Sequence, residues 1–275
     1  MGPRPAGAYA GAAADGPGAA AGAAWAMAPL AHALSAGLRG TARLLDQALA
    51  PGRCSLCDLP SGRSLDLCPV CEGDLPGLER PCRRCALPLP AGAASELCGP
   101  CLRRPPPFET LTAACAYADP ADLLVTGLKF RRERHAARVM AALMVGRAGA
   151  RLPAFRAGEA CLVPVPLHPL RRWRRGHDQA ALLARQLAAF TGLPLAPGLV
   201  RRVRATAPQA GLGRRARKRN SAGAFRARPA VRDRHLVLVD DVATTGATLA
   251  AVARAARRAG ARRVDAWVFA RTERP

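Results

Sequence analysis

The chain has 275 residues and a formal net charge of +23, from 42 Lys and Arg against 19 Asp and Glu. That surplus favours anionic partners such as phosphates, nucleic acid or an acidic protein. No charge-free stretch carries enough large aliphatic residues to predict a membrane span, and the length allows one medium or two small domains.

Residues 1–50 form an Ala/Gly-rich segment whose first 26 residues bury too little surface to order themselves. Leucines recur at helical spacing between Met27 and Ala50, which predicts one short amphipathic helix. A signal peptide is the alternative for the charge-free run 16–38, but prolines interrupt it and export suits zinc thiolates poorly. We therefore expect a cytoplasmic protein, with Met27 as the candidate true start.

Eight of the ten cysteines form four C-x-x-C pairs. Each pair places two thiolates on one side of a tight turn, and two pairs supply the four tetrahedral sulfurs that Zn²⁺ prefers. The segment holds few large apolar side chains, so its folding requires the metal. We predict a double zinc ribbon over residues 51–104 with two structural zinc sites. The predicted ligands are Cys54, Cys57, Cys68, Cys71, Cys82, Cys85, Cys98 and Cys101.

Two arrangements are possible for which C-x-x-C pairs bind the same zinc ion. In the sequential order the first and second pairs hold one zinc, and the third and fourth hold the other. A cross-braced order joins the first pair to the third and the second to the fourth. The spacers of ten, ten and twelve residues favour the sequential order, because each ribbon then closes locally. Cys115 and Cys161 lie alone in apolar stretches and are expected to be buried core residues.

Strands and helices alternate through residues 105–275, after a boundary at the RRPPPF run of 103–108. Alternation of this kind predicts an α/β fold with a parallel sheet flanked by helices. Asp119 is the expected cap of the first helix. The predicted strands are 111–117, 162–166, 235–239 and 264–269, and the predicted helices are 119–130, 134–147, 177–191 and 247–259.

The sharpest functional pattern is LVLVDDVATTGAT at residues 236–248. A buried strand ends at Asp240 and Asp241, and a Thr/Gly turn then leads into a helix. Small residues let the backbone close around an anion, and the helix start presents free N–H groups to it. Adjacent carboxylates accept hydrogen bonds from vicinal hydroxyls or help to hold a metal. The stretch therefore predicts a sugar-phosphate site.

This stretch resembles the ribose 5-phosphate signature of type I phosphoribosyltransferases. The resemblance implies that Asp240 and Asp241, the catalytic acid pair, contact the ribose hydroxyls of phosphoribosyl pyrophosphate (PRPP), which binds with Mg²⁺. The turn that it assigns to the 5′-phosphate comprises Ala243, Thr244, Thr245, Gly246, Ala247 and Thr248, with Ala243 standing where the family usually has a larger residue.

Two further stretches resemble the ComF family of competence-associated proteins, which also carry a double zinc ribbon. Residues 163–185 match its pyrophosphate-loop region, with His177 and Asp178 in place of the commoner aromatic residue and Asn. Residues 201–225 match its mobile loop. The resemblance implies further PRPP contacts from Val165, Pro166, Arg175, Gln179 and Arg217.

The residues themselves support that interpretation only for some side chains. A diphosphate concentrates negative charge, and arginines supply bidentate donors to it. Most arginines here are expected to be surface charge, and Arg175 and Arg217 are the two that we favour. Lys129 is a further candidate because the chain has only two lysines, and a helix-end cap is the equal alternative for it. His135, His168 and His235 show no catalytic partner in the sequence and are assigned no catalytic role.

Three functional hypotheses remain open. The first is a Mg²⁺-dependent phosphoribosyltransferase with an unidentified acceptor. The second is a non-catalytic protein that binds PRPP or a nucleotide. The third, suggested by the ComF resemblance, is an adaptor for single-stranded DNA and a translocase of the DNA-uptake machinery. Zinc ribbons and basic charge suit the third hypothesis, although residues that stack on bases are few.

Overall fold

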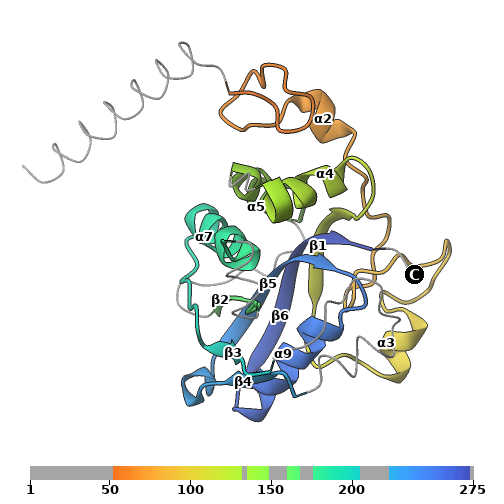
Figure 1. The fold of residues 1–275 in the computed structure, drawn as a ribbon. Helices are drawn as coiled ribbons and strands as arrows, with labels where there is room; N and C mark the ends of the chain where they lie inside the picture. Colours follow the sequence, from red (N-terminus) through yellow and green to blue (C-terminus); the bar gives the residue numbers. More distant parts are fainter. Residues whose placement is uncertain (1–51, 132–134, 149–159, 168–175, 205–222, 273–275) are drawn as a thin grey trace, which may run out of the picture. The chain divides into compact units, whose positions relative to one another are not determined.

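Four parallel strands form the central sheet of the computed structural model, which describes residues 52–131, 135–148, 160–167, 176–204 and 223–272. Their order across the sheet is β1–β6–β5–β2 (Figure 1). Every neighbouring pair is parallel. The strands are β1 (Leu111–Ala116), β2 (Ala160–Pro164), β5 (His235–Ala243) and β6 (Arg263–Arg271).

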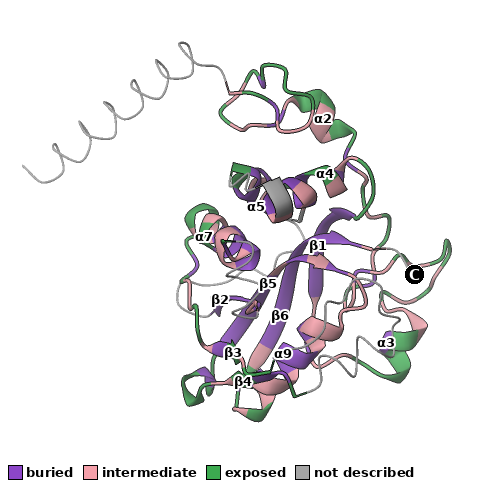
Figure 2. Ribbon diagram, in the orientation of Figure 1, coloured by how far each residue is buried: buried purple, intermediate pink, exposed green. Residues whose placement is uncertain are grey.

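Helices cover both faces of this sheet, and successive side chains of the central strands point to opposite faces. On β5, Val237 and Val239 join the core cluster beneath α5 (His135–Ala148) and α7 (Gln179–Thr191). Leu236 and Leu238 join the cluster beneath α9 (Ala247–Arg258). Burial on both faces accounts for the apolar runs in the sequence, and Figure 2 shows the strands as the most buried part of the domain.

Shorter elements complete the described chain. The helix α4 (Ala121–Thr126) continues into a π-helix over Gly127–Arg131. A small antiparallel sheet pairs β3 (Val200–Arg202) with β4 (Phe225–Ala227), followed by a 3-10 turn over Pro229–Val231. Each cysteine-rich unit carries one short helix, α2 (Pro69–Gly73) or α3 (Gly99–Arg103).

The prediction for the first helix of the α/β domain was wrong in two respects. Pro120 is the N-cap residue, and it makes no side-chain capping bond, so Asp119 is not the cap. The α-helix ends at Thr126 because the backbone then widens into the π-helix. The predicted segment 119–130 therefore contains two kinds of helix.

The strand that carries the acid pair is longer than predicted. It pairs with β6 as far as Ala243, opposite Arg271, so Asp240 and Asp241 lie within β5 and not after it. The flanks of the expected mobile loop form β3 and β4, which the sequence did not predict. The helix expected between Met27 and Ala50 lies outside the described residues.

Candidate functional site

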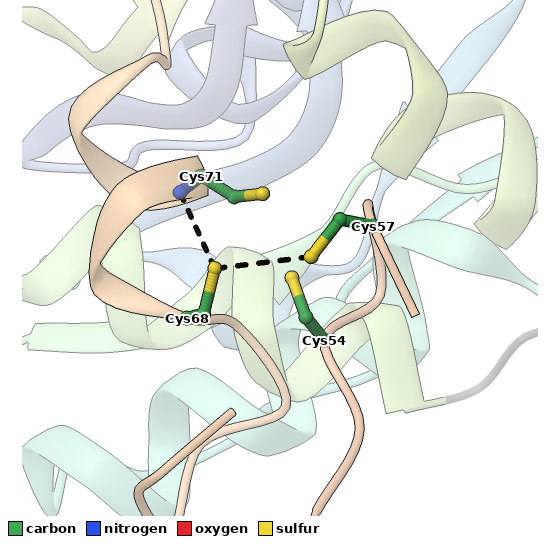
Figure 3. Close-up of side chains that lie close together, drawn as sticks. All are labelled: Cys54, Cys57, Cys68 and Cys71. Atoms are coloured by element: carbon green, nitrogen blue, oxygen red, sulfur yellow. Dashed lines mark hydrogen bonds between the residues drawn. The ribbon is translucent and has the colours of Figure 1, made fainter. Parts of the chain in front are cut away.

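Two clusters of four cysteines lie in the N-terminal part of the described chain. In each cluster, all four Sγ atoms lie within 4.8 Å of one another. Tetrahedral zinc with Zn–S bonds of about 2.3 Å separates its sulfurs by about 3.8 Å. The Sγ atoms of Cys57 and Cys68 are 3.9 Å apart (Figure 3). Those of Cys85 and Cys98 are 3.6 Å apart. Both clusters therefore fit Zn²⁺.

These clusters confirm the sequential order of metal sharing. The first joins Cys54 and Cys57 to Cys68 and Cys71, and the second joins the last two pairs. In each cluster, the second C-x-x-C pair lies at the start of a short helix. The Sγ of Cys68 accepts the backbone N–H of Cys71. Four thiolates fill a tetrahedral site, so both sites are structural and have no open position for a substrate.

The pKa values of the thiols and the repulsion between thiolates also favour a bound cation in each cluster. Burial and the neighbouring thiols raise the pKa of Cys85 to about 12, and burial also raises the pKa of Cys101. Burial opposes ionisation of Cys54 as well, but backbone N–H groups, led by that of Cys57, lower its pKa to about 6. Four crowded thiolates repel one another, and a divalent cation relieves that repulsion.

The first cluster is joined to the α/β domain through α5. Cys54, Leu67 and Leu75 belong to the same buried core cluster as the apolar side chains of this helix. Arg138 donates to the carbonyl of Ser64, and Arg147 donates to that of Leu75. The first zinc ribbon thus completes the core above α5.

A tight turn links β5 to α9 at the carboxyl end of the sheet. Gly246 begins α9 in the left-handed conformation, at φ 70°, and makes no side-chain capping bond. The hydroxyl of Thr245 accepts the N–H of Ala247 at 3.3 Å. Glycine adopts this conformation without strain, so the turn closes tightly, and a helix start of this kind is able to bind an anion.

The acid pair lies immediately before this turn. Asp240 accepts the N–H of Asp241 at 3.0 Å, and Asp241 accepts the N–H of Val242 at 2.7 Å. The other oxygen of Asp241 lies 2.9 Å from the ammonium of Lys129. Burial, followed by the charge of Asp241, raises the pKa of Asp240 well above its usual value. Bringing a cation or a hydroxyl donor to the pair is therefore favourable.

Arg271, at the end of β6, holds the turn from the side of the second zinc ribbon. The side chain is 4% exposed and donates to the carbonyls of Ala243, Thr244 and Thr272. It also donates to the carbonyl of Cys85 at 2.8 Å. One guanidinium therefore connects a residue of the second cysteine cluster to the turn between β5 and α9.

A cavity of about 840 Å³ lies beside this connection. The turn at 244–247 and Arg254 of α9 form part of its wall, and the Pro105–Phe108 segment and the second zinc ribbon form the rest. The prolines and Phe108 make most of this surface apolar.

The second predicted stretch approaches the same end of the sheet from β2 and α7. The N–H of Val165 bonds to the carbonyl of Val239, and Pro166 follows it half-buried. Asp178 caps α7 by accepting the N–H of Ala181, and Gln179 is buried at the first position of the helix. Arg175 and Arg217 lie outside the described residues.

His177 has a role that the sequence did not reveal. Its ring is buried, and Nε2 donates to the carbonyl of Leu128 in the π-helix at 2.6 Å. The start of α7 is thereby tied to the segment that carries Lys129. His235 also has a partner, because its Nε2 lies 2.7 Å from Asp265 within β6. This pair lies at the opposite end of β5 from the acid pair, which gives it a structural role.

Comparison with known families defines the class of the protein. A profile described as "Phosphoribosyl transferase domain" matches residues 174–274, and one described as "Double zinc ribbon domain" matches residues 45–102. The first covers the acid pair and the turn, and the second covers all eight zinc-site cysteines. The chain is therefore a phosphoribosyltransferase-type α/β protein with a double zinc ribbon.

Curated relatives refine this assignment. "DNA utilization protein YhgH" of Salmonella typhimurium is 39% identical over 81% of this chain and 98% of its own length. "Competence protein F" of Haemophilus influenzae is 34% identical over 56% of this chain and 69% of its own. The chain belongs to the ComF family.

Solved structures of phosphoribosyltransferase type are more distant. The Leishmania donovani hypoxanthine-guanine phosphoribosyl transferase is 18% identical, with a TM-score of 0.32 over 49% of this chain and 67% of its own. The phosphoribosylpyrophosphate synthetase of Mycobacterium smegmatis is 18% identical at a TM-score of 0.26, and this chain spans 33% of its length. Likeness at this level carries no argument about activity.

Proposed function

We propose that the protein binds PRPP, with the ribose 5-phosphate at residues 240–248. The observation that carries this proposal is the sequence of groups at the end of β5: two adjacent carboxylates, then a turn with Gly246 at φ 70°, then the start of α9. The turn suits the 5′-phosphate, and the carboxylates suit the vicinal ribose hydroxyls.

Magnesium is proposed to arrive with the ligand. Mg²⁺ keeps several waters and is usually held by one or two carboxylates together with substrate phosphates. Among the described residues, the acid pair is not part of a cluster that could hold a metal unaided. Asp240 offers the carboxylate oxygens and the ligand's diphosphate offers the rest. When bound, the ion neutralises charge on the diphosphate.

A transferase with this site breaks the bond between C1 of the ribose and the diphosphate, and an acceptor then bonds to C1. The protein contributes position and electrostatic stabilisation, with the acid pair near the positive charge that develops on the ribose. The proposed contacts with PRPP beyond the turn are Asp240, Asp241, Val165, Pro166, Gln179, Arg175 and Arg217. A non-catalytic protein that senses PRPP or a nucleotide would use the same site without an acceptor.

Calorimetric titration of the zinc-loaded protein with PRPP and Mg²⁺ tests the proposal. We expect binding by the unaltered protein and its loss in the Asp240→Asn/Asp241→Asn double variant. At a ligand concentration 100-fold above Kd, stabilisation of about 2.7 kcal/mol accompanies binding. Absence of both heat and stabilisation at saturating PRPP would reject a PRPP site.

A second candidate function is attachment to single-stranded DNA as part of DNA uptake. The names of the relatives, "DNA utilization protein" and "Competence protein F", favour this link, and the net charge of +23 is consistent with it. Phosphate contacts make affinity fall steeply with salt. We expect fluorescence anisotropy to show that the protein binds an oligothymidine at about 50 mM salt and that this binding is lost at higher salt. No binding at 50 mM would remove this candidate and also the need for a translocase partner.

None of the helices in the described residues combines the length and the hydropathy that a bilayer crossing requires. The protein is proposed to act in the cytoplasm, where zinc thiolates remain reduced.

A further inference from the structure

Lys129 makes a direct contact with the candidate acid pair. Its ammonium lies 2.9 Å from Oδ2 of Asp241, and the two side chains are only 23% and 10% exposed. Asp241 is thus engaged on both oxygens, because Oδ1 accepts the N–H of Val242. A ribose hydroxyl that approaches Asp241 therefore meets a carboxylate with a donor already on each oxygen, one of them the ammonium of Lys129.

The backbone around Lys129 is fixed by neighbouring elements. The residue lies in the π-helix Gly127–Arg131, a rare conformation that is frequent at functional sites. The preceding residue, Leu128, is fully buried, and its carbonyl accepts a hydrogen bond from His177 at 2.6 Å. These contacts hold the main chain while the four-carbon stem of the lysine remains able to turn.

The charges at this place oppose an anionic ligand unless a cation balances them. Besides Asp240 and Asp241, Asp178 at the start of α7 is close enough to raise the pKa of Asp240, whereas Lys129 lowers it. In the ranges that the structure describes, Lys129 is the cation paired with the acid pair. A diphosphate entering this cluster needs that positive charge as well as any that Mg²⁺ brings.

We propose that Lys129 changes partner when PRPP binds: its ammonium leaves Asp241 and donates to the diphosphate, and Asp241 then accepts a ribose hydroxyl. Lys129 is thereby a ligand-binding residue that distinguishes PRPP from ribose 5-phosphate, which lacks the diphosphate. This inference rests on the proposed PRPP site and assigns one further residue to it.

The test compares two ligands on the zinc-loaded full chain. Calorimetry with Mg²⁺ measures the affinities for PRPP and for ribose 5-phosphate in the unaltered protein, Lys129→Met and Lys129→Arg. We expect Lys129→Met to weaken PRPP by about tenfold or more and to leave ribose 5-phosphate unchanged or bound more tightly. Lys129→Arg keeps the charge and recovers part of the PRPP affinity.

Arg226→Met is the matched control, because it removes one exposed positive charge from β4. It corrects for a general electrostatic effect and is expected to weaken PRPP by less than about twofold. Thermal unfolding checks that each variant is folded, and Lys129→Gln replaces the Met variant if that one is not.

Three results would overturn the inference. Equal weakening of both ligands by Lys129→Met means that Lys129 only holds Asp241 in place. Unchanged PRPP affinity means that the ammonium does not reach the diphosphate. Binding of neither ligand by the unaltered protein refutes the PRPP site itself, which separates failure of the proposed function from failure of this inference.

Discussion

Replacing Arg271 by methionine tests the connection between the second zinc ribbon and the turn between β5 and α9. Arg271 donates to the carbonyls of Cys85, Ala243, Thr244 and Thr272. Methionine keeps much of the apolar stem but donates no hydrogen bond. The variant therefore removes the donors without emptying the space.

The cost follows from the carbonyls that lose their donor. Ala243 and Thr244 keep hydrogen bonds from the backbone and the hydroxyl of Thr272, whereas within the described residues Arg271 is the donor to the carbonyls of Cys85 and Thr272. Each buried carbonyl left unsatisfied costs about 1–3 kcal/mol. Arg271 borders the cavity, so water reaches part of this surface. We expect the free energy of unfolding to fall by about 3 kcal/mol.

Scanning calorimetry of the zinc-loaded protein measures this loss. For a domain of this size, about 3 kcal/mol corresponds to a fall in Tm of about 6–12 °C. Arg271→Lys keeps a charge but cannot reach four carbonyls at once, so its Tm should lie between the two. A Tm for Arg271→Met within about 2 °C of the Arg226→Met control would refute the reasoning.

Three other changes have defined outcomes. Gly246→Ala should lower the free energy of unfolding by about 1–2 kcal/mol, measured by urea unfolding, because alanine is strained at φ 70°. An added Cβ meets no neighbour within 4 Å, so no clash adds to this strain, and the affinity for PRPP should fall with the change in the turn. Unchanged stability would contradict the assigned conformation. Cys101→Ser should reduce the zinc content from two ions to one by native mass spectrometry, because the clusters share no ligand; retention of two ions would contradict separate sites. Asp265→Asn should destabilise at neutral pH, since hydrogen bonds from His235 and Thr110 overcome the effect of burial and lower the pKa of Asp265. A carboxylate with a lowered pKa stabilises the fold above its unfolded value, about 3.9, so the difference between the variant and the unaltered protein should shrink as pH falls below about 4; a difference that stays constant as pH falls below about 4 would contradict the pairing.

Local patterns carried the successful predictions. The spacing of the C-x-x-C pairs predicted the sequential clusters, because ligands close in sequence need only short loops to meet. The apolar run before Asp240 and the Thr/Gly turn predicted β5, the turn and α9, although β5 continues through the acid pair to Ala243. Cys115 and Cys161 are buried in the core as expected.

Contacts between distant segments had no local signature. Arg271 and Cys85 are 186 residues apart, and nothing in the sequence distinguishes this arginine from the other 39. His177 and Leu128 meet only because the fold brings the residues just before α7 next to the π-helix. A π-helix also lacks a pattern of its own, so the segment with Lys129 was predicted as ordinary α-helix. Lysine is rare in this chain, which made Lys129 a candidate, but its partner Asp241 became known only from the fold.

A crystal structure of the zinc-loaded protein with PRPP and Mg²⁺ tests the central claim most directly. The account predicts density for the 5′-phosphate at the turn 243–248, with the ribose hydroxyls on Asp240 and Asp241 and the ammonium of Lys129 turned to the diphosphate. PRPP bound elsewhere, or a turn that remains empty at saturating ligand, would contradict it.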